Sequence, residues 1–262
     1  MGARPVRAAA ALATLAAGIT LLLNGESGAR HRVGNLEVVA ISHVSRSAVV
    51  RLITRRRVVA LSFDDGPDPR FTPAALRIIR DFGAHATFFA VGRSAVAHRA
   101  LIRAELRAGN EVQNHTWDHA DLRRLGAGAA EAEVARGRAA LCAAGAPAPT
   151  LFRAPYGNFT AAGSRQAERD HELMVGWTFT VERALDGRSP AHAVAWMVRR
   201  LRPGAIILAH DGRLDRSRTL VALPLLLRAL HARGYGVVSV SSLLGIGGAE
   251  TRAAARQLGG AL

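Results

Sequence analysis

The sequence predicts a single α/β domain, built as a distorted (β/α)7-type barrel. From residue 58 onward, short apolar runs alternate with helical patterns in about seven strand–helix units. Polar, reactive residues follow four of the apolar runs, as they do at the carboxyl face of barrel folds. Hydrophobic residues make up 49% of the 262 residues, which is enough to form the core of one domain.

Each predicted element has its own pattern. The run Val-Val-Ala-Leu-Ser-Phe at 58–63 is typical of a buried strand, because it is short and almost entirely apolar. Residues 72–81 place their apolar side chains on one side, which predicts a helix. Gly109 and Gly145 close two further helices. The predicted strands are 58–63, 86–91, 111–114, 151–153, 174–177, 206–209 and 236–240. The predicted helices are 72–81, 97–108, 127–144, 191–201 and 220–233.

The first 24 residues have the pattern of an export segment. Arg4 and Arg7 precede an apolar run at 8–23 that carries no polar stripe. We therefore expect residues 1–24 to be a cleaved export signal or a retained membrane anchor. The protein would then be secreted, or anchored to the outer face of the cytoplasmic membrane.

The rest of the chain divides into three predicted parts. Residues 25–57 form a stem or linker, in which 38–41 fits a strand and 47–53 fits a strand or a short helix. Residues 58–246 form the domain, and 247–262 form a tail rich in glycine and alanine.

The chain is strongly basic. Its 35 basic residues are all arginine, and the net charge is +15. This charge predicts attraction to an anionic cell wall or membrane surface. No helix-turn-helix, zinc-finger or RNA-binding pattern accompanies it, so we expect no nucleic-acid partner. We expect a monomer.

Two adjacent carboxylates, Asp64 and Asp65, end the first strand before a Gly-Pro turn. Burying neighbouring carboxylates is unfavourable unless a cation or a proton offsets their repulsion. The pattern fits either a cation site or a plain Asp-Gly turn with a helix-capping aspartate.

His115 and His119 follow the strand at 111–114. Histidines at i and i+4 lie on one face of a helical turn, so both imidazoles would reach one ion. Together with Asp65 they provide three protein ligands and leave one coordination position open. A catalytic metal needs that arrangement to bind a water molecule.

Two later strands also end in polar groups. The segment Phe-Arg-Ala-Pro-Tyr-Gly at 152–157 follows one strand, and His210 ends the apolar strand at 206–209. Barrel enzymes assemble their sites from such strand ends.

These four segments resemble the motifs of the polysaccharide deacetylase family, also known as NodB-homology domains or carbohydrate esterase family 4. The motifs Phe-Asp-Asp-Gly-Pro, His-Thr-x-x-His, Arg-x-Pro-Tyr-Gly and Leu-x-His appear in the order typical of the family. The resemblance extends from about residue 58 to residue 244, and the ordered set is far more specific than any single motif.

The resemblance implies a role for each residue of the centre. Asp65, His115 and His119 would hold a divalent metal, with zinc expected and cobalt, nickel or manganese as alternatives. Asp64 would be the general base that deprotonates the attacking water. His210 would be the general acid that protonates the departing sugar amine.

It also implies five surrounding roles. Arg153 would orient the base. The backbone N–H of Tyr156 would stabilise the oxyanion. Leu208 would line the pocket for the acetyl methyl group, and Pro155 and Trp177 would contact substrate.

One segment departs from the family pattern. Many members carry Asp-Pro-x-Asp-Trp after a tryptophan, and its second aspartate pairs with the catalytic histidine. Here the segment that begins at Trp177 reads Trp-Thr-Phe-Thr-Val-Glu-Arg-Ala-Leu-Asp-Gly. We assign the partner role to Asp186, with Glu182 as the alternative.

The predicted function is therefore that of a metal-dependent hydrolase acting on carbon–nitrogen bonds other than peptide bonds. It would remove N-acetyl groups from an amino-sugar polysaccharide such as peptidoglycan or a chitin-like chain. The alternatives are an esterase for O-acetylated polysaccharides of the xylan type and an inactive relative that binds glycan. The inactive relative is disfavoured, because a binding module has no need of base, ligands and acid together.

Overall fold

The computed structural model describes residues 30–33, 36–41 and 46–245. The predicted export segment at 1–24 and the tail at 247–262 lie outside the described residues. Within the described part, no helix is both long enough and apolar enough to cross a membrane.

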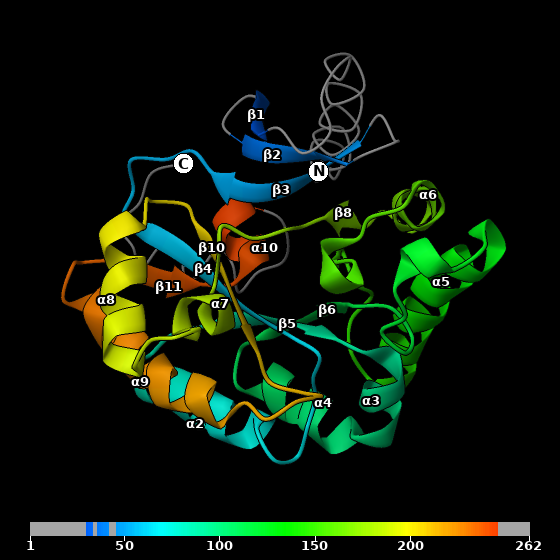
Figure 1. Ribbon diagram of the computed structural model, residues 1–262. Coiled ribbons are helices and arrows are strands. Elements are labelled where there is room, and N and C mark those ends of the chain that lie inside the picture. Colours follow the sequence, from blue (N-terminus) through cyan, green and yellow to red (C-terminus); the bar gives the residue numbers. More distant parts are fainter. Residues whose placement is uncertain (1–29, 34–35, 42–45, 246–262) are drawn as a thin grey trace, which may run out of the picture.

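A parallel sheet forms the centre of the domain (Figure 1). Its strands run in the order β8-β7-β6-β5-β4-β10-β9, and β11 pairs with the first residues of β4. The predicted α/β class is confirmed, and the barrel is a curled half-barrel with β8 and β9 at its two ends. The strands are β4 (Val58–Asp64), β5 (Ala86–Ala90), β6 (Glu111–Asn114), β7 (Leu151–Phe152), β8 (Leu173–Met174), β9 (Phe179–Thr180), β10 (Ile206–His210) and β11 (Gly236–Val238).

A strand from the predicted stem bridges the opening of this half-barrel. Strands β1 (Arg30–Val33), β2 (Leu36–Ile41) and β3 (Arg46–Leu52) form a small antiparallel sheet. On the side of β8, Gly176 donates a 2.8 Å hydrogen bond to the Val49 carbonyl. On the side of β10, Leu52 donates a 2.9 Å bond to Gly204. Residues 46–52 therefore pack as part of the domain, although the sequence predicts a stem up to residue 57.

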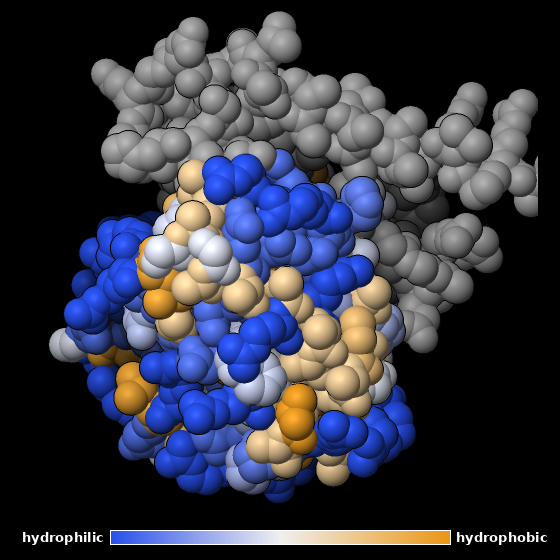
Figure 2. All heavy atoms as spheres, turned by 90° about the vertical axis from the view of Figure 1, so that its right-hand side faces the viewer, coloured by the Kyte–Doolittle hydropathy of each residue, from blue (hydrophilic) through white to orange (hydrophobic). Residues whose placement is uncertain are grey.

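Helices cover the outside of the sheet (Figure 1). Helices α2, α8 and α9 lie on one side, and α5 and α6 lie on the opposite side, where hydrophilic residues surround a paler, weakly apolar band (Figure 2). The helices are α2 (Thr72–Asp81), α3 (Gly92–Ala97), α4 (Arg99–Arg107), α5 (Ala127–Ala144), α6 (Ala161–Arg169), α7 (Val181–Leu185), α8 (Pro190–Arg200), α9 (Ser217–His231) and α10 (Val240–Leu244).

Four of the five predicted helices are confirmed, and the fifth is divided. The helix predicted at 97–108 breaks at His98, whose φ of −126° and ψ of 47° are not helical. Helix α3 therefore begins earlier, at Gly92, and α4 follows as a separate helix. The short helices α6, α7 and α10 are not among those the sequence predicts.

Alternate side chains of β10 pack in two different parts of the core. Ile207 and Ala209 pack in the cluster beneath α2, α8 and α9, whereas Ile206 packs in the cluster that includes Val49. Because side chains alternate along a strand, Leu208 and His210 lie on the same face as Ile206. The interior of the half-barrel thus carries His210 at its carboxyl end.

All paired strands of the central sheet are parallel, so their carboxyl ends meet at one edge. Asp64 and His210 are register partners on β4 and β10. Asn114 ends β6 and pairs with Phe152 of β7. The fold therefore collects the four predicted segments at one place.

Candidate active site

Asp64 is the last residue of β4, and Asp65 begins the turn after it. Asp65 has a φ of 77°, a left-handed conformation that costs a non-glycine residue roughly 1–3 kcal/mol. The turn is tightly packed, because a Cβ atom on Gly66 would collide with the Asp211 carboxylate and one on Gly212 with the Asp65 carbonyl. Only glycine fits at positions 66 and 212. The side chains of Asp64 and Asp65 are both buried.

The two histidines come from a loop, so the predicted helical turn at 115–119 is wrong. Thr116 and His119 both have a positive φ, of 68° and 65°. Side chains hold this conformation: Asn114 Oδ1 accepts from Thr116 N at 3.0 Å, and Thr116 Oγ1 accepts from His119 N at 3.2 Å. The loop nevertheless brings both imidazoles to one point.

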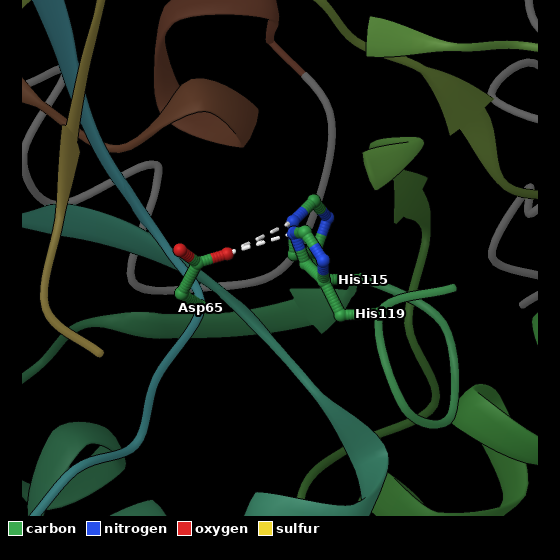
Figure 3. Close-up of side chains that lie close together, drawn as sticks. All are labelled: Asp65, His115 and His119. Carbon is green, nitrogen blue, oxygen red and sulfur yellow. Dashed lines mark ion pairs between the residues drawn. The ribbon is translucent and has the colours of Figure 1, made fainter. Parts of the chain in front are cut away.

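Asp65, His115 and His119 converge as predicted (Figure 3). Asp65 Oδ1 lies 2.9 Å from His119 Nε2 and 3.7 Å from His115 Nε2. One ligand atom from each residue lies within 4.8 Å of the other two, and all three residues are buried. A tetrahedral zinc site, with bonds of roughly 2.0–2.2 Å, places its ligand atoms about 3.3–3.6 Å apart.

The unsatisfied atoms of the cluster fit a cation. Asp65 Oδ1 is buried and accepts no hydrogen bond from the residues that the structure describes. His115 Nδ1 lies 2.7 Å from the Arg153 carbonyl, which can only accept, so its proton is on Nδ1 and Nε2 presents a lone pair. A buried lone pair facing a carboxylate oxygen is unfavourable without a positive ion between them.

Protonation at the cluster suits metal ligands. Burial opposes ionisation of Asp65, but its contacts with His115 and His119 outweigh burial and lower its pKa. Burial lowers the pKa of His119, with further lowering from His115 and Arg213, although Asp65 opposes the change. An ionised carboxylate and a neutral imidazole are the forms that bind a metal.

Arg153 holds the other aspartate, as predicted. Its Nη1 donates to Asp64 Oδ1 at 2.7 Å and to Ser62 Oγ at 2.9 Å, while Nε and Nη2 donate to the carbonyls of Val175 and Gly176. The side chain is fully buried, with its guanidinium 4.0 Å from the centre of a phenylalanine ring. This fixed geometry directs Asp64 Oδ2 toward His115 Nε2, at 3.8 Å.

The partner of His210 is Glu182, and the assignment of Asp186 is wrong. Glu182 Oε2 lies 2.9 Å from His210 Nδ1, and Glu182 Oε1 accepts from His210 N at 3.1 Å. Asp186 follows the last residue of α7 and is exposed. Glu182 lies in the first turn of α7, and Thr219 Oγ1 donates to it at 2.8 Å. A helix between residues 181 and 185 points these two acids in different directions, which residue spacing alone does not reveal.

This pair shifts both groups toward their charged forms. Burial alone would lower the pKa of His210, but Glu182 and the charges of Asp64 and Asp65 outweigh burial and raise it. Burial would raise the pKa of Glu182, but its interactions with His210 and Thr219 lower it.

The predicted substrate contacts surround this centre. Tyr156 has a φ of 59°, is 60% exposed, and packs its ring edge-on against His119 at 4.7 Å between centroids. Pro155 and Leu208 are buried, and Leu208 lies two residues before His210 on β10. Trp177 is partly buried and contacts Gly157 and the Arg153 guanidinium.

Arg216 is a site residue that the sequence reading missed. Its Nη2 donates to Asp65 Oδ2 at 2.8 Å and its Nε to the Gly212 carbonyl at 2.8 Å, and the side chain is buried. It therefore occupies the Asp65 oxygen that faces away from the histidines. One arginine among many in a basic chain carries no sequence signal of this role.

A second set of residues that the sequence did not predict, Asn114, Arg138 and Glu172, supports the histidine loop. Asn114 donates to the carboxylate of Glu172 at 2.9 Å, and Arg138 donates to the same carboxylate at 3.2 Å. Burial raises the pKa of Glu172 to about 8, despite the hydrogen bonds from Asn114 and Arg138. These residues are 24 to 58 positions apart, so only the fold brings them together.

Several known proteins are similar to this chain. The sequence profile described as polysaccharide deacetylase matches residues 52–175. A peptidoglycan-N-acetylglucosamine deacetylase of Bacillus cereus is 33% identical over 190 residues, covering 72% of this chain and 88% of that protein. A chitooligosaccharide deacetylase of Bradyrhizobium is 33% identical over 199 residues, covering 71% and 90%.

The fold agrees with these sequence matches. A family 4 carbohydrate esterase from Streptomyces lividans, solved in complex with acetate, superposes with a TM-score of 0.63 at 32% identity. The match covers 69% of this chain and 91% of that one. Together with the ordered motifs and their convergence at the sheet edge, these similarities show that the chain belongs to the polysaccharide deacetylase family.

Proposed function

We propose that this protein is a metal-dependent deacetylase that removes N-acetyl groups from an amino-sugar polysaccharide, either peptidoglycan or a chitin-like chain. One observation carries the proposal: a three-ligand cluster lies beside a carboxylate held by an arginine, and the neighbouring strand carries a histidine paired with a glutamate. Relatives at 33% identity are named as deacetylases of these two substrates, which supports the same reaction here.

The metal would be held by Asp65, His115 and His119. When bound, a divalent cation lowers the pKa of a water ligand and polarises an acyl oxygen. Zinc suits two imidazoles and a carboxylate, and cobalt, nickel or manganese would also accept this ligand set.

Asp64 would act as the general base. It lies beside His115 but is held by Arg153, so one of its oxygens is committed and the other faces the centre. A base in this position takes the proton of the attacking water as the new C–O bond forms. Arg153 restricts the carboxylate to that orientation, which lowers the entropic cost of reaching the transition state.

His210 would act as the general acid. An amide nitrogen leaves as an amine only when it receives a proton, and the interaction with Glu182 favours the protonated imidazole. The backbone N–H of Tyr156 would donate to the oxyanion, and Leu208 would contact the acetyl methyl group.

Two alternatives keep part of this chemistry. An esterase for O-acetylated polysaccharide would use the same attack, but an alkoxide leaving group depends less on His210. An inactive glycan-binding relative would have no use for the buried base, acid and ligand set. The paired His210 and Glu182 therefore favour the amide substrate.

We also propose that the protein acts outside the cytoplasmic membrane. The apolar segment at 8–23 follows two arginines, and the net charge of +15 suits an anionic wall. Both features support export, either as a secreted protein or on a retained anchor.

Acetate release from peptidoglycan, chitooligosaccharides and acetylated xylan tests the reaction, with and without chelator and added zinc. We expect release from an N-acetylated substrate that chelator abolishes and zinc restores. Asp64→Asn should lower kcat/KM by about 10³-fold, within the range of general base catalysis, while the metal content stays unchanged. Release from xylan alone would establish the esterase instead, and binding without release from any substrate would establish the inactive relative.

A further inference from the structure

The loop after β10 contains a strained turn centred on an arginine. Leu214 N donates to the Gly212 carbonyl at 2.8 Å, and the residue between them, Arg213, has a φ of 65°. This is a γ-turn with a positive central φ, which is rare and strained for a residue with a side chain. Strain of this kind persists only where the surrounding structure imposes it, and it is concentrated at functional sites.

The surrounding structure that imposes this turn is the metal-ligand cluster. The backbone of Gly212 packs so closely against Asp65 that a Cβ atom would not fit. Arg216 joins the two segments, since it donates to the Gly212 carbonyl and to the Asp65 carboxylate. Arg213 is therefore displayed at a fixed position beside the catalytic centre.

The side chain of Arg213 is exposed. No carboxylate among the described residues pairs with it. Three acidic groups lie on or near this loop: Asp68 pairs with Arg70, Asp215 accepts from Ser217, and Asp211 is buried and accepts from Thr72.

Two apolar side chains accompany this charge. Leu214, on the same turn, is 65% exposed, and Tyr156 is 60% exposed against His119. They are two of only three large hydrophobic side chains that are exposed in the described part of the chain. Exposed aromatic and aliphatic groups beside a catalytic centre suit the apolar faces of sugar rings, so the arginine lies where a glycan would pass.

We propose that Arg213 is a subsite residue that binds a carboxylate carried by the acetylated glycan. The inference rests on the proposed deacetylase function and narrows its substrate to anionic glycans. Peptidoglycan carries carboxylates on its lactyl and peptide groups, whereas chitin chains carry none. A guanidinium binds a carboxylate through two parallel hydrogen bonds, which gives orientation as well as affinity.

The test compares Arg213→Gln with the wild-type protein on two substrates of equal length. One is a neutral chitooligosaccharide, and the other is a glycan fragment that carries lactyl carboxylates. We expect the ratio of kcat/KM on the anionic substrate to that on the neutral one to fall about tenfold in the variant. Methyl esterification of the carboxylates should abolish the difference between the two proteins.

Arg228→Gln is the matched control for charge. Arg228 is exposed on α9, twelve residues after Arg216 and so about 18 Å further along the helix axis. The substitution Arg228→Gln removes the same charge as Arg213→Gln. The ratio of kcat/KM on the anionic substrate to that on the neutral one should remain that of the wild type. An equal loss in both variants would mean that the net charge, and not a subsite at Arg213, attracts the substrate, and would overturn the proposal.

Binding to the same two glycans, measured by calorimetry with and without zinc, separates this inference from the proposed function. If Arg213→Gln weakens carboxylate-dependent binding about tenfold, the subsite is supported even where no acetate is released. The absence of release would then count against the proposed deacetylase activity and not against the subsite. An unchanged Kd together with an unchanged substrate ratio overturns the subsite while leaving the deacetylase intact.

Discussion

Two histidines of the site, His119 and His210, differ in the direction of their pKa shifts although both are largely buried. Burial lowers the pKa of His119, and Asp65 does not fully offset it. The same burial acts on His210, but Glu182 at 2.9 Å outweighs it, so the pKa of His210 rises. Asp65, the carboxylate beside His119, also contacts His115 and Arg216. Glu182 contacts His210 and also accepts a hydrogen bond from the neutral hydroxyl of Thr219.

The difference separates two chemical roles within one cluster. A histidine that binds a metal must be neutral, and a histidine that acts as a general acid must be protonated near the working pH. The same residue type thus takes different charge states because the groups around each imidazole and its carboxylate differ. Neighbouring groups, more than burial, therefore assign the roles.

Removing each histidine should separate these roles most clearly. His119→Ala removes a ligand, so metal content should fall and acetate release should drop by at least about 10³-fold. His210→Ala should lower kcat/KM by about 10²- to 10³-fold while the metal content stays at one ion per chain. Elemental analysis together with acetate assays measures both, and metal loss in His210→Ala would show that the two histidines share one role.

Arg216→Gln should affect the metal side alone. The arginine orients Asp65 through the oxygen that faces away from the histidines. Without it the carboxylate rotates freely, and metal affinity should weaken about 10- to 100-fold, as for other groups that orient a ligand. Competition with a chelator of known affinity measures the change. At saturating metal, kcat should recover most of the wild-type value, and a loss that excess metal does not restore would contradict this role.

Glu182→Gln should act on the acid side alone. Burial lowers the pKa of His210 and Glu182 raises it, so the variant should lose protonated His210 at a lower pH than the wild type. The alkaline limb of the kcat/KM profile should then move to lower pH, with a loss of about tenfold above the new pKa. Asp186→Asn is the control, because Asp186 is exposed and makes no contact with His210 through its side chain. An alkaline limb that moves in Asp186→Asn and not in Glu182→Gln would reverse the assignment made from the structure.

The error at this position shows what the sequence can predict. Asp64, Asp65, His115 and His119 lie next to strand ends, so the strand pattern alone predicts that they converge. Asp186 and Glu182 both follow a weak two-residue strand, and a five-residue helix decides which of them faces His210. Short helices add too little periodicity to be predicted, and α6, α7 and α10 were missed for that reason.

Tertiary contacts explain the remaining differences. Strand β3 has a clear strand pattern, but its place across the open half-barrel depends on hydrogen bonds to residues more than 120 positions away. The histidine loop has helical spacing, yet Asn114 and Thr116 hold it in left-handed conformations. Local pattern predicts the existence of such elements, and long-range partners determine their conformation.

Glu105 extends the comparison to a buried carboxylate that has no cation beside it among the described residues. It lies on α4 with none of its surface exposed, and its two oxygens accept no hydrogen bond from any residue in the described part of the chain. Burial, together with the charge of Asp211, raises its pKa well above the usual value. Burial also acts on Asp65 and on the partly exposed Glu182, but their partners lower the pKa of each.

Glu105→Gln should therefore stabilise the protein at neutral and alkaline pH. The pKa of Glu105 is higher in the folded state than its value of 4.5 in the unfolded chain. Below pH 4.5 the group is neutral in both states, and the free energy of unfolding falls as the pH rises from there toward the folded pKa. That loss is about 1.4 kcal/mol for each pH unit, and glutamine, which cannot ionise, should remove it. Urea unfolding at pH 5 and pH 8 measures the effect, with Asp81→Asn on the exposed end of α2 as the control. A stability difference that does not grow with pH would mean that Glu105 has a partner when ionised, and that burial without a cation is not what distinguishes it from Asp65.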